Sequence, residues 1–144
     1  MSPASSSRDV TLTEMDDTYD QSLEQLDGHA WGDPPDGATG LMERVHRLRT
    51  VKLKDLSGED LSTLLGQREG AEWLVPLVLD LLEDDPLAGD WYPGQLLLGV
   101  LMNKDYFERF PHELIRLHAI RQALNSLRDE ADKLLANPDW PRDI

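Results

Sequence analysis

The sequence predicts an all-α fold, a compact bundle of about five helices with a disordered acidic N-terminal arm. Leucine supplies 26 of the 144 residues, whereas valine and isoleucine together supply 9. This balance favours helices, because strands prefer β-branched residues. After residue 39, apolar residues also recur at spacings of three and four, which is the period of one helix face.

Two helices are expected in the first half of the chain. Leu41, Val45 and Leu48 follow one another at spacings of four and three, which predicts a helix over about 40–50 whose opposite face carries Arg44, Arg47 and Arg49. A second helix over 58–66 has two end signals. Its start resembles a capping box, in which Ser57 is followed three residues later by an acid, and Gly66 is a natural stop.

The third predicted helix covers about 70–84. It is apolar on most of its circumference, which is typical of a helix at the centre of a bundle. Pro76 falls near its seventh position, where it is expected to kink the helix or to mark a late start. A strand over 73–79 is the competing interpretation, but the length of the segment and its leucine content favour a helix.

Two more helices complete the predicted bundle. Pro93 suits the first position of a helix over about 93–103. A short turn around Tyr106 and Phe107 then leads to Pro111, which suits the first position of a last helix over about 111–136. The apolar residues of this last segment trace one stripe over about six turns.

The N-terminal part of the chain differs from the rest in charge. Residues 1–38 contain nine acids and one base, a net charge of −8, and the first eight residues are rich in serine. Such a segment buries too little apolar surface to offset its ordering entropy. We therefore expect a disordered acidic arm over 1–20 and one helical domain over 21–144. Leu23, Leu26 and Trp31 form an anchor segment before a turn over 32–37.

The composition excludes several classes of function. Aspartate and glutamate number 28 against 14 lysines and arginines, a formal charge of −14, which would repel nucleic-acid phosphates and anionic membrane surfaces. The absence of cysteine excludes disulfides and thiolate metal sites. Because there is neither an apolar run of membrane-spanning length nor a signal peptide, we expect a cytoplasmic protein.

No motif indicates an enzyme active site or a binding site for a cofactor, a metal or a small-molecule substrate. His112-Glu113 begins like a zinc-protease motif, but Arg116 occupies the place of the second histidine. Serine-nucleophile elbows, phosphate-binding glycine loops and calcium-loop spacings are also missing. An enzyme would need a pocket lined by His112, Glu113 or the acids at 83–85.

The distribution of charge points to an interface. Residues 41–54 hold five bases and one acid, whereas residues 69–90 hold seven acids and no base and lead directly into Trp91 and Tyr92. Aromatic side chains supply anchoring area, and charge sets association rate and partner choice. Alternatively, Trp91 and Tyr92 pack under the loop and fasten it to the core. The candidate partner-binding residues are Asp80, Glu83, Asp84, Asp85, Asp90, Trp91 and Tyr92.

A series of short motifs runs in order from Ser22 to Met102. The motifs are Leu23-Glu24-Gln25-Leu26, Trp31-Gly32-Asp33-Pro34-Pro35, Leu53-Lys54-Asp55-Leu56, Glu59-Asp60-Leu61, Leu64-Leu65-Gly66-Gln67, Leu74-Val75-Pro76-Leu77, Asp85-Pro86-Leu87, Gly89-Asp90-Trp91-Tyr92-Pro93-Gly94 and Leu96-Leu97. In this order and spacing, the chain resembles the immunity proteins of contact-dependent growth inhibition (CDI) systems. These small bacterial proteins protect a cell from a toxin delivered by its neighbours.

The resemblance implies a non-enzymatic inhibitor. Such a protein would bind the C-terminal domain of its cognate toxin in the cytoplasm and block the active site of the toxin. Many such toxins are nucleases, which are basic, and a chain with a charge of −14 suits a basic partner. The alternative is a general adaptor module that uses the acidic arm as a partner-binding tail.

Overall fold

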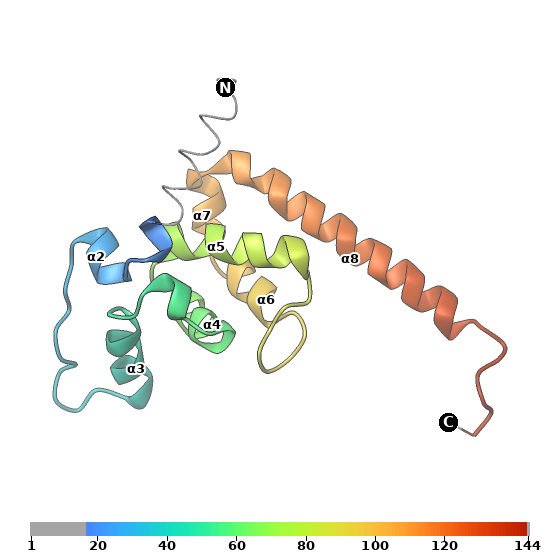
Figure 1. Cartoon of the computed structure of the whole chain (residues 1–144), viewed down its shortest axis with the longest axis horizontal. Coiled ribbons are helices and arrows are strands. Elements are labelled where there is room, and N and C mark those ends of the chain that lie inside the picture. Colours follow the sequence, from blue (N-terminus) through green and yellow to red (C-terminus); the bar gives the residue numbers. More distant parts are fainter. Residues whose placement is uncertain (1–16, 144) are drawn as a thin grey trace.

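The computed structural model describes residues 17–143, and within this range it is helical with no strand beyond a single isolated bridge between Ser22 and Lys52. Two 3-10 helices, η1 (Leu53–Asp55) and η2 (Pro111–Glu113), join seven α-helices that lie wholly within this range (Figure 1). The α-helices of the described range are α2 (Leu23–Asp27), α3 (Gly40–Leu48), α4 (Gly58–Gly66), α5 (Ala71–Asp84), α6 (Gln95–Leu101), α7 (Lys104–Arg109) and α8 (Leu114–Leu135). The predicted all-α class is confirmed.

Helices α3, α4 and α5 lie where the sequence places them, to within two residues at each end. The capping box that begins α4 is present. The hydroxyl oxygen of Ser57 accepts from the backbone N–H of Asp60 at 3.0 Å, and the carboxylate of Asp60 accepts from the backbone N–H of Ser57 at 3.1 Å. Pro76 lies inside α5, which continues on both sides of it, so the helical interpretation of 73–79 is correct and the strand is not formed.

The bundle of about five predicted helices is roughly consistent with the structure, but the count differs because short helices such as α2 and α7 were not recognised. Helix α2 replaces part of the anchor segment and begins with a capping box between Ser22 and Gln25. Helix α7 replaces the predicted turn around Tyr106 and Phe107, both of which are buried. Helices of five or six residues complete fewer than two turns, so no apolar period develops in them.

Both prolines proposed as first helical residues precede the α-helices that they were expected to begin. Helix α6 starts at Gln95, after Gly94 in the left-handed region (φ 87°), so Pro93 belongs to the preceding loop. Pro111 does begin a helical segment, but that segment is the 3-10 helix η2, and α8 follows from Leu114.

Helix α5 is the centre of the bundle, as its apolar circumference predicts. It packs against α4, α6, α7 and α8. Its fully buried side chains are Leu74, Val75, Val78, Leu79 and Leu82. The N-terminal anchor reaches this core through Leu23, which is also fully buried. A Cβ at Gly70 would lie 2.6 Å from the Leu23 side chain, so the glycine makes room for this contact.

The loop between α2 and α3 is held in place by a buried arginine, Arg49, although the sequence analysis places this residue on the polar face of its helix. The Arg49 side chain is 1% exposed. It donates to Asp27 at 2.7 Å, to Glu69 at 2.5 Å and to the backbone oxygen of His29 at 2.7 Å, while its guanidinium lies 4.5 Å from the centre of the Trp31 ring. Burial alone would raise the pKa of Asp27, but the Arg49 guanidinium holds this pKa below its ordinary value.

Residues 17–20, which the sequence assigns to the acidic arm, contact the helical body. The Tyr19 hydroxyl donates to Asp80 at 2.9 Å, and Asp20 pairs with Lys52 at 3.2 Å and Lys54 at 2.7 Å. Residues 1–16, the remainder of the predicted arm, lie outside the described residues.

Helix α8 extends past the rest of the bundle. Its first half packs on α5, and its second half continues away from the other helices toward the C-terminus (Figure 1). No helix in residues 17–143 combines the length and the apolar character needed to cross a bilayer.

Candidate functional site

The candidate surface is built on the segment between α5 and α6, residues 85–94, which we call the Trp91 loop. Backbone hydrogen bonds close this loop on itself. The N–H of Gly94 donates to the oxygen of Leu87 at 2.9 Å, and the N–H of Leu96 donates to the oxygen of Ala88 at 3.2 Å. The Asp85 carboxylate accepts from the Leu87 N–H at 3.0 Å. The two ends of the loop are therefore held close together, as in compact surface loops.

Gln95 fixes the tip of the Trp91 loop to α4. Its side-chain oxygen accepts from the backbone N–H groups of Asp90 and Trp91, both at 3.0 Å. Its side-chain nitrogen donates to the Glu59 carboxylate at 2.7 Å. Gln95 is 4% exposed, so these hydrogen bonds are largely shielded from water. Nothing in the sequence pattern singles out this glutamine.

Asp90 also contacts α4. Its carboxylate accepts from the backbone N–H of Glu59 at 2.9 Å, where the first turn of α4 leaves N–H groups without helical partners. A Cβ at Gly58 would lie 2.6 Å from the Asp90 carboxylate, so the glycine lets the acid approach the helix. Asp90 was predicted as a partner-binding residue, but its carboxylate is occupied in holding the loop.

The two aromatic side chains of the loop face solvent. Trp91 is 75% exposed and Tyr92 is 48% exposed, so the alternative in which they pack under the loop is wrong. Leu87 adds a third apolar side chain to the same loop and is likewise exposed. The backbone that carries Trp91 is held by Gln95, so an exposed tryptophan is displayed on a fixed support.

The acids of α5 are only partly available, because Arg116 of α8 pairs with two of them. Its guanidinium donates to Glu83 at 2.7 Å and makes a short contact with Asp80, which also accepts from Tyr19. Burial alone would lower the pKa of Arg116, but Glu83 and Asp80 raise it above its ordinary value. Burial, assisted by Asp80, raises the pKa of Tyr19 to about 12.

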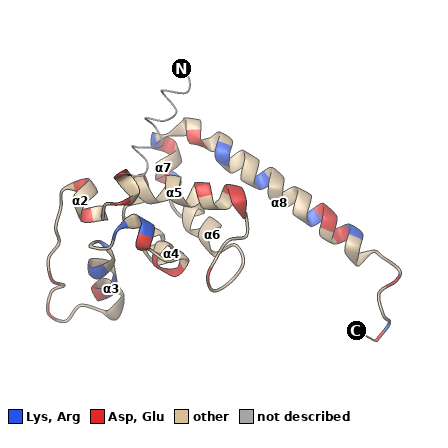
Figure 2. Cartoon of the chain, viewed as in Figure 1, with Lys and Arg blue, Asp and Glu red and all other residues tan. Residues whose placement is uncertain are grey.

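The structure therefore divides the seven predicted residues. Asp80, Glu83 and Asp90 have partners in other helices, whereas Asp84 and Asp85 are exposed at the C-terminal end of α5 and Asp85 accepts only from the nearby Leu87 N–H. Acidic residues colour this end of α5 in Figure 2. Sequence reasoning missed Glu59 and Arg116 because each acts from a distant part of the chain, and it missed Gln95, which directly follows the loop, because its role depends on the contact with Glu59 of α4. The exposed residues that remain as candidate partner contacts, all within residues 84–92, are Asp84, Asp85, Leu87, Trp91 and Tyr92.

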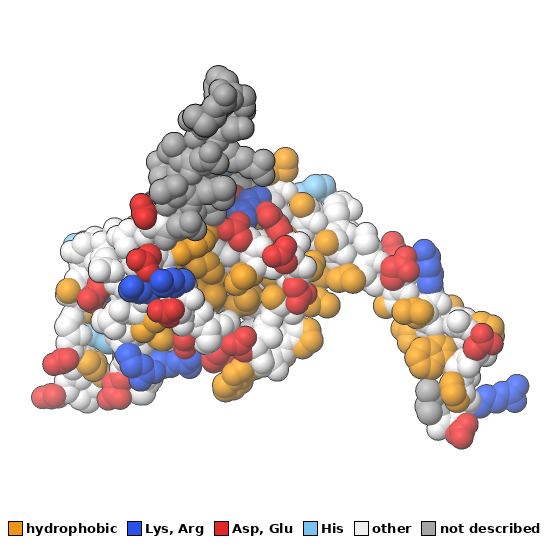
Figure 3. All heavy atoms as spheres, in the orientation of Figure 1, with side chains coloured by type: hydrophobic (Ala, Val, Ile, Leu, Met, Phe, Trp, Pro, Cys, Tyr) orange, Lys and Arg blue, Asp and Glu red, His pale blue; other side chains and the backbone are white. Residues whose placement is uncertain are grey.

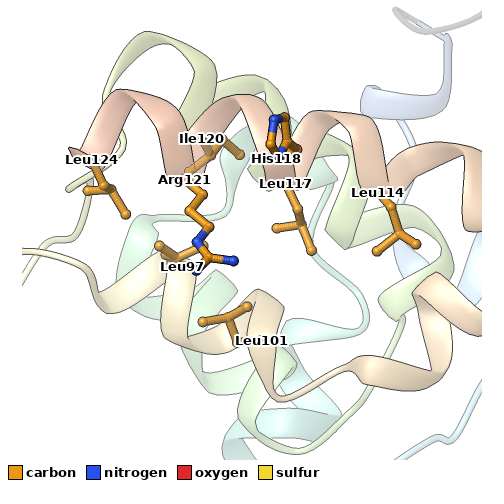
Figure 4. A pocket seen from close by; sticks show the side chains of 8 residues that line it. All are labelled: Leu97, Leu101, Leu114, Leu117, His118, Ile120, Arg121 and Leu124. Carbon is orange, nitrogen blue, oxygen red and sulfur yellow. The ribbon is translucent and has the colours of Figure 1, made fainter. Parts of the chain in front are cut away.

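Two other features bear on chemistry. Within residues 17–143, no group of three or more histidines and acids is placed to hold a metal ion. An apolar groove of about 410 Å³ lies between α6 and α8 (Figure 4). Neither His112, Glu113 nor the acids at 83–85 line it, so it lacks the residues that an enzymatic interpretation required.

These features describe a small helical protein with an exposed aromatic loop on a fixed support. A family model for CDI immunity proteins matches residues 25–117, well over half of the chain, and the chain belongs to this family. The match confirms the resemblance found over Ser22 to Met102 and includes the whole Trp91 loop. It ends at Leu117, so most of α8 lies outside it. Neither the curated proteins nor the solved structures gave a match.

Proposed function

We propose that this protein binds the C-terminal toxin domain of a CDI system in the cytoplasm and neutralises it by covering its active site or substrate path. Membership of the CDI immunity family supports toxin neutralisation. In this role the protein acts by occupying a surface and performs no reaction of its own. The observation that carries the choice of surface is the Trp91 loop, with its exposed aromatic pair on a fixed backbone.

The construction of the loop favours tight binding. Tryptophan and tyrosine are enriched among the residues that contribute most to interface energies, because each buries a large area. Binding also costs entropy when a flexible loop must be ordered. Gln95 and Asp90 already hold the Trp91 loop through α4, so most of this ordering cost is met during folding. The contacts that Trp91 makes with the toxin can then contribute to affinity without being offset by the entropy cost of ordering the loop.

The charge of the chain suits a basic, nuclease-type toxin. The total is −14, and the internal pairs of Arg44, Arg49 and Arg116 neutralise much of the basic charge of the body. Asp84 and Asp85 remain exposed beside the Trp91 loop. Complementary fields raise association rates and disfavour wrong partners. We therefore assign the acids to steering and the aromatic residues to the bulk of the affinity.

The test uses the toxin domain that is encoded next to this protein. Trp91→Ala should weaken the affinity for that domain by about 30-fold or more, the effect of a central interface residue. Trp140→Ala is the matched control, because Trp140 is also an exposed tryptophan, 50% accessible, but lies beyond the end of α8. Both variants should keep the thermal stability of the wild type. Equal affinities for the two variants would remove the Trp91 loop from the interface.

The acids are tested separately. Reversal of Asp84 and Asp85 to lysine should lower the association rate and flatten its dependence on salt, and the dissociation rate should change little. Glu24→Lys is a suitable control, because Glu24 lies on α2, outside the Trp91 loop and the end of α5. An unchanged association rate for the Asp84 and Asp85 variant would contradict their role in steering.

A further inference from the structure

Helix α6 presents exposed apolar side chains directly after the Trp91 loop. Leu98 and Leu101 of this helix and Met102 at its end are 51%, 46% and 50% exposed. In Figure 3, apolar side chains gather in the middle of the body, in the region of α5 and α6. Because α6 begins at Gln95, the residue that holds the Trp91 loop, this apolar surface adjoins the loop. Contiguous exposed apolar surface is typical of interaction sites in soluble proteins.

The apolar groove between α6 and α8 continues this surface. Leu97 and Leu101 line it from α6, and leucines from Leu114 to Leu124 line it from α8, with the side chains of the two helices pointing toward one another (Figure 4). It follows α8 over this stretch of ten residues, about 15 Å of helix. A second hollow of about 520 Å³ shares Leu101 and Leu114 with it and extends it to Phe107. The groove is therefore elongated, which suits a helix or an extended segment better than a single side chain.

Arg121 places a cation over this groove. Its side chain reaches across the groove from α8 toward α6 (Figure 4). Within residues 17–143 no acid forms an ion pair with it, whereas Arg116, on the same helix, pairs with Glu83. An occupant of the groove withdraws the guanidinium from water, which is costly unless the occupant supplies an opposite charge or a hydrogen-bond acceptor. The groove therefore favours an apolar occupant that carries a carboxylate.

The Trp91 loop is too small to form a stable interface by itself. Specific interfaces bury about 800 Å² on each partner and use about 20–30 residues on each side. The exposed candidate contacts of the loop number five, all within residues 84–92. A toxin domain that binds the loop tightly must therefore cover neighbouring surface as well. Helix α6 and its groove are the apolar surface that follows the loop along the chain.

We propose that the toxin domain places an amphipathic helix in the groove between α6 and α8, with its apolar face against the leucines and a carboxylate against Arg121. This inference rests on the toxin binding proposed above and names a second contact of the same complex. Recognition of a helix in a groove uses apolar anchors at spacings of three, four and seven residues. A helix of about three turns spans the 15 Å of the groove. Together with the Trp91 loop, it supplies the buried area that the loop alone lacks.

Titration calorimetry of the full chain with the toxin domain encoded next to it tests the groove contact. Leu101→Asp should weaken the affinity by about 10-fold or more, because it sets a charge among the leucines that the toxin helix covers. Leu41→Asp is the matched control, because Leu41 is a similarly exposed leucine, 44% accessible, on α3. Its affinity should stay within about two-fold of the wild type. Circular dichroism and thermal unfolding check that both variants keep the fold.

A charge reversal tests the carboxylate. Arg121→Glu should also weaken the affinity by about 10-fold or more, because it sets like charges opposite one another. Arg47→Glu changes the net charge of the chain equally and is the control, because Arg47 is an exposed arginine on α3. Replacement of the paired toxin acid by lysine should restore the affinity for Arg121→Glu and so identify that acid.

Three results would overturn the groove contact. The first is that Leu101→Asp and Arg121→Glu bind like their controls; toxin binding through the Trp91 loop would still stand if Trp91→Ala weakened the affinity. The second is a free chain that sediments at twice 16.3 kDa and returns to 16.3 kDa in Leu101→Asp with unchanged toxin affinity, because the groove would then hold a second copy. The third is a wild-type chain that does not bind the toxin domain, which would remove the proposed function as well.

Discussion

Replacement of Arg49 by alanine should destabilise the protein by about 3 kcal/mol. The guanidinium is 1% exposed and binds two carboxylates, those of Asp27 and Glu69. Removing one partner of a buried ion pair costs about 3–5 kcal/mol, because the other charge is left without compensation. The two acids are 21% and 23% exposed, so water can reach them in part, and we expect the lower end of this range.

Thermal and urea unfolding measure this loss. For a chain of this length, about 3 kcal/mol corresponds to a fall in Tm of about 10 °C. Arg47→Ala is the matched control, because Arg47 is an exposed arginine on the same segment, and its removal should change the free energy of unfolding by about 0.5 kcal/mol or less. Equal free energies of unfolding for Arg49→Ala and Arg47→Ala would show that Arg49 does not hold the loop between α2 and α3 in place.

Two further predictions rest on the described contacts, and a third concerns the N-terminal segment. Arginines hold the pKa values of Asp27 and Asp60 below their ordinary values, against the effect of burial. The stability that these ion pairs contribute is therefore complete above about pH 4 and is lost as pH falls through the pKa of the folded state. Urea unfolding between pH 6 and pH 2.5 should show this loss, and Arg49→Ala should flatten the dependence of the free energy of unfolding on pH. Gln95→Ala leaves the backbone N–H groups of Asp90 and Trp91 without an acceptor. The variant should therefore lower the free energy of unfolding by about 1–3 kcal/mol and speed amide hydrogen exchange at both positions. Unchanged exchange rates would contradict the role of Gln95 in holding the loop. Deletion of residues 1–16 should leave toxin affinity unchanged in titration calorimetry, whereas an adaptor that binds through its acidic arm would lose its partner.

The parts of the fold that the sequence predicts well have local causes. Helices α3, α4 and α5 are at least two turns long and carry an apolar period. The start of α4 is also marked by Ser57 and Asp60, which are three residues apart. Helix α2 had a comparable signal in Ser22 and Gln25, a standard capping box that the prediction did not use. Helix α7 has no side-chain cap, so its position depends on the burial of its aromatic residues.

The candidate surface was harder to predict because its contacts are long-range. The sequence shows seven acids without a base between residues 69 and 90, but Arg116 comes from α8 to pair with Glu83 and Asp80. Asp90 and Gln95 each contact α4, more than 30 residues earlier in the chain. Pairings of this kind depend on how the helices pack, which residue spacing does not encode.

Arg49 illustrates the same limit within a helical segment. The prediction groups it with Arg47 opposite the apolar stripe, although residues two apart lie about 200° from one another around a helix. Arg49 follows the last residue of α3 and turns inward to Asp27 and Glu69. These two acids lie 22 and 20 residues from it in the chain. The burial of Arg49 can be recognised only once the packing of α2 and of the loop after α4 against α3 is known.

The most direct test of toxin neutralisation is to titrate the activity of the neighbouring toxin domain with this protein. Toxin activity should fall in proportion to added protein and reach zero at a one-to-one ratio of toxin to protein chain. Trp91→Ala should require an excess, in line with its weaker affinity. Toxin activity that persists in the presence of excess wild-type protein would show that this protein does not neutralise that toxin.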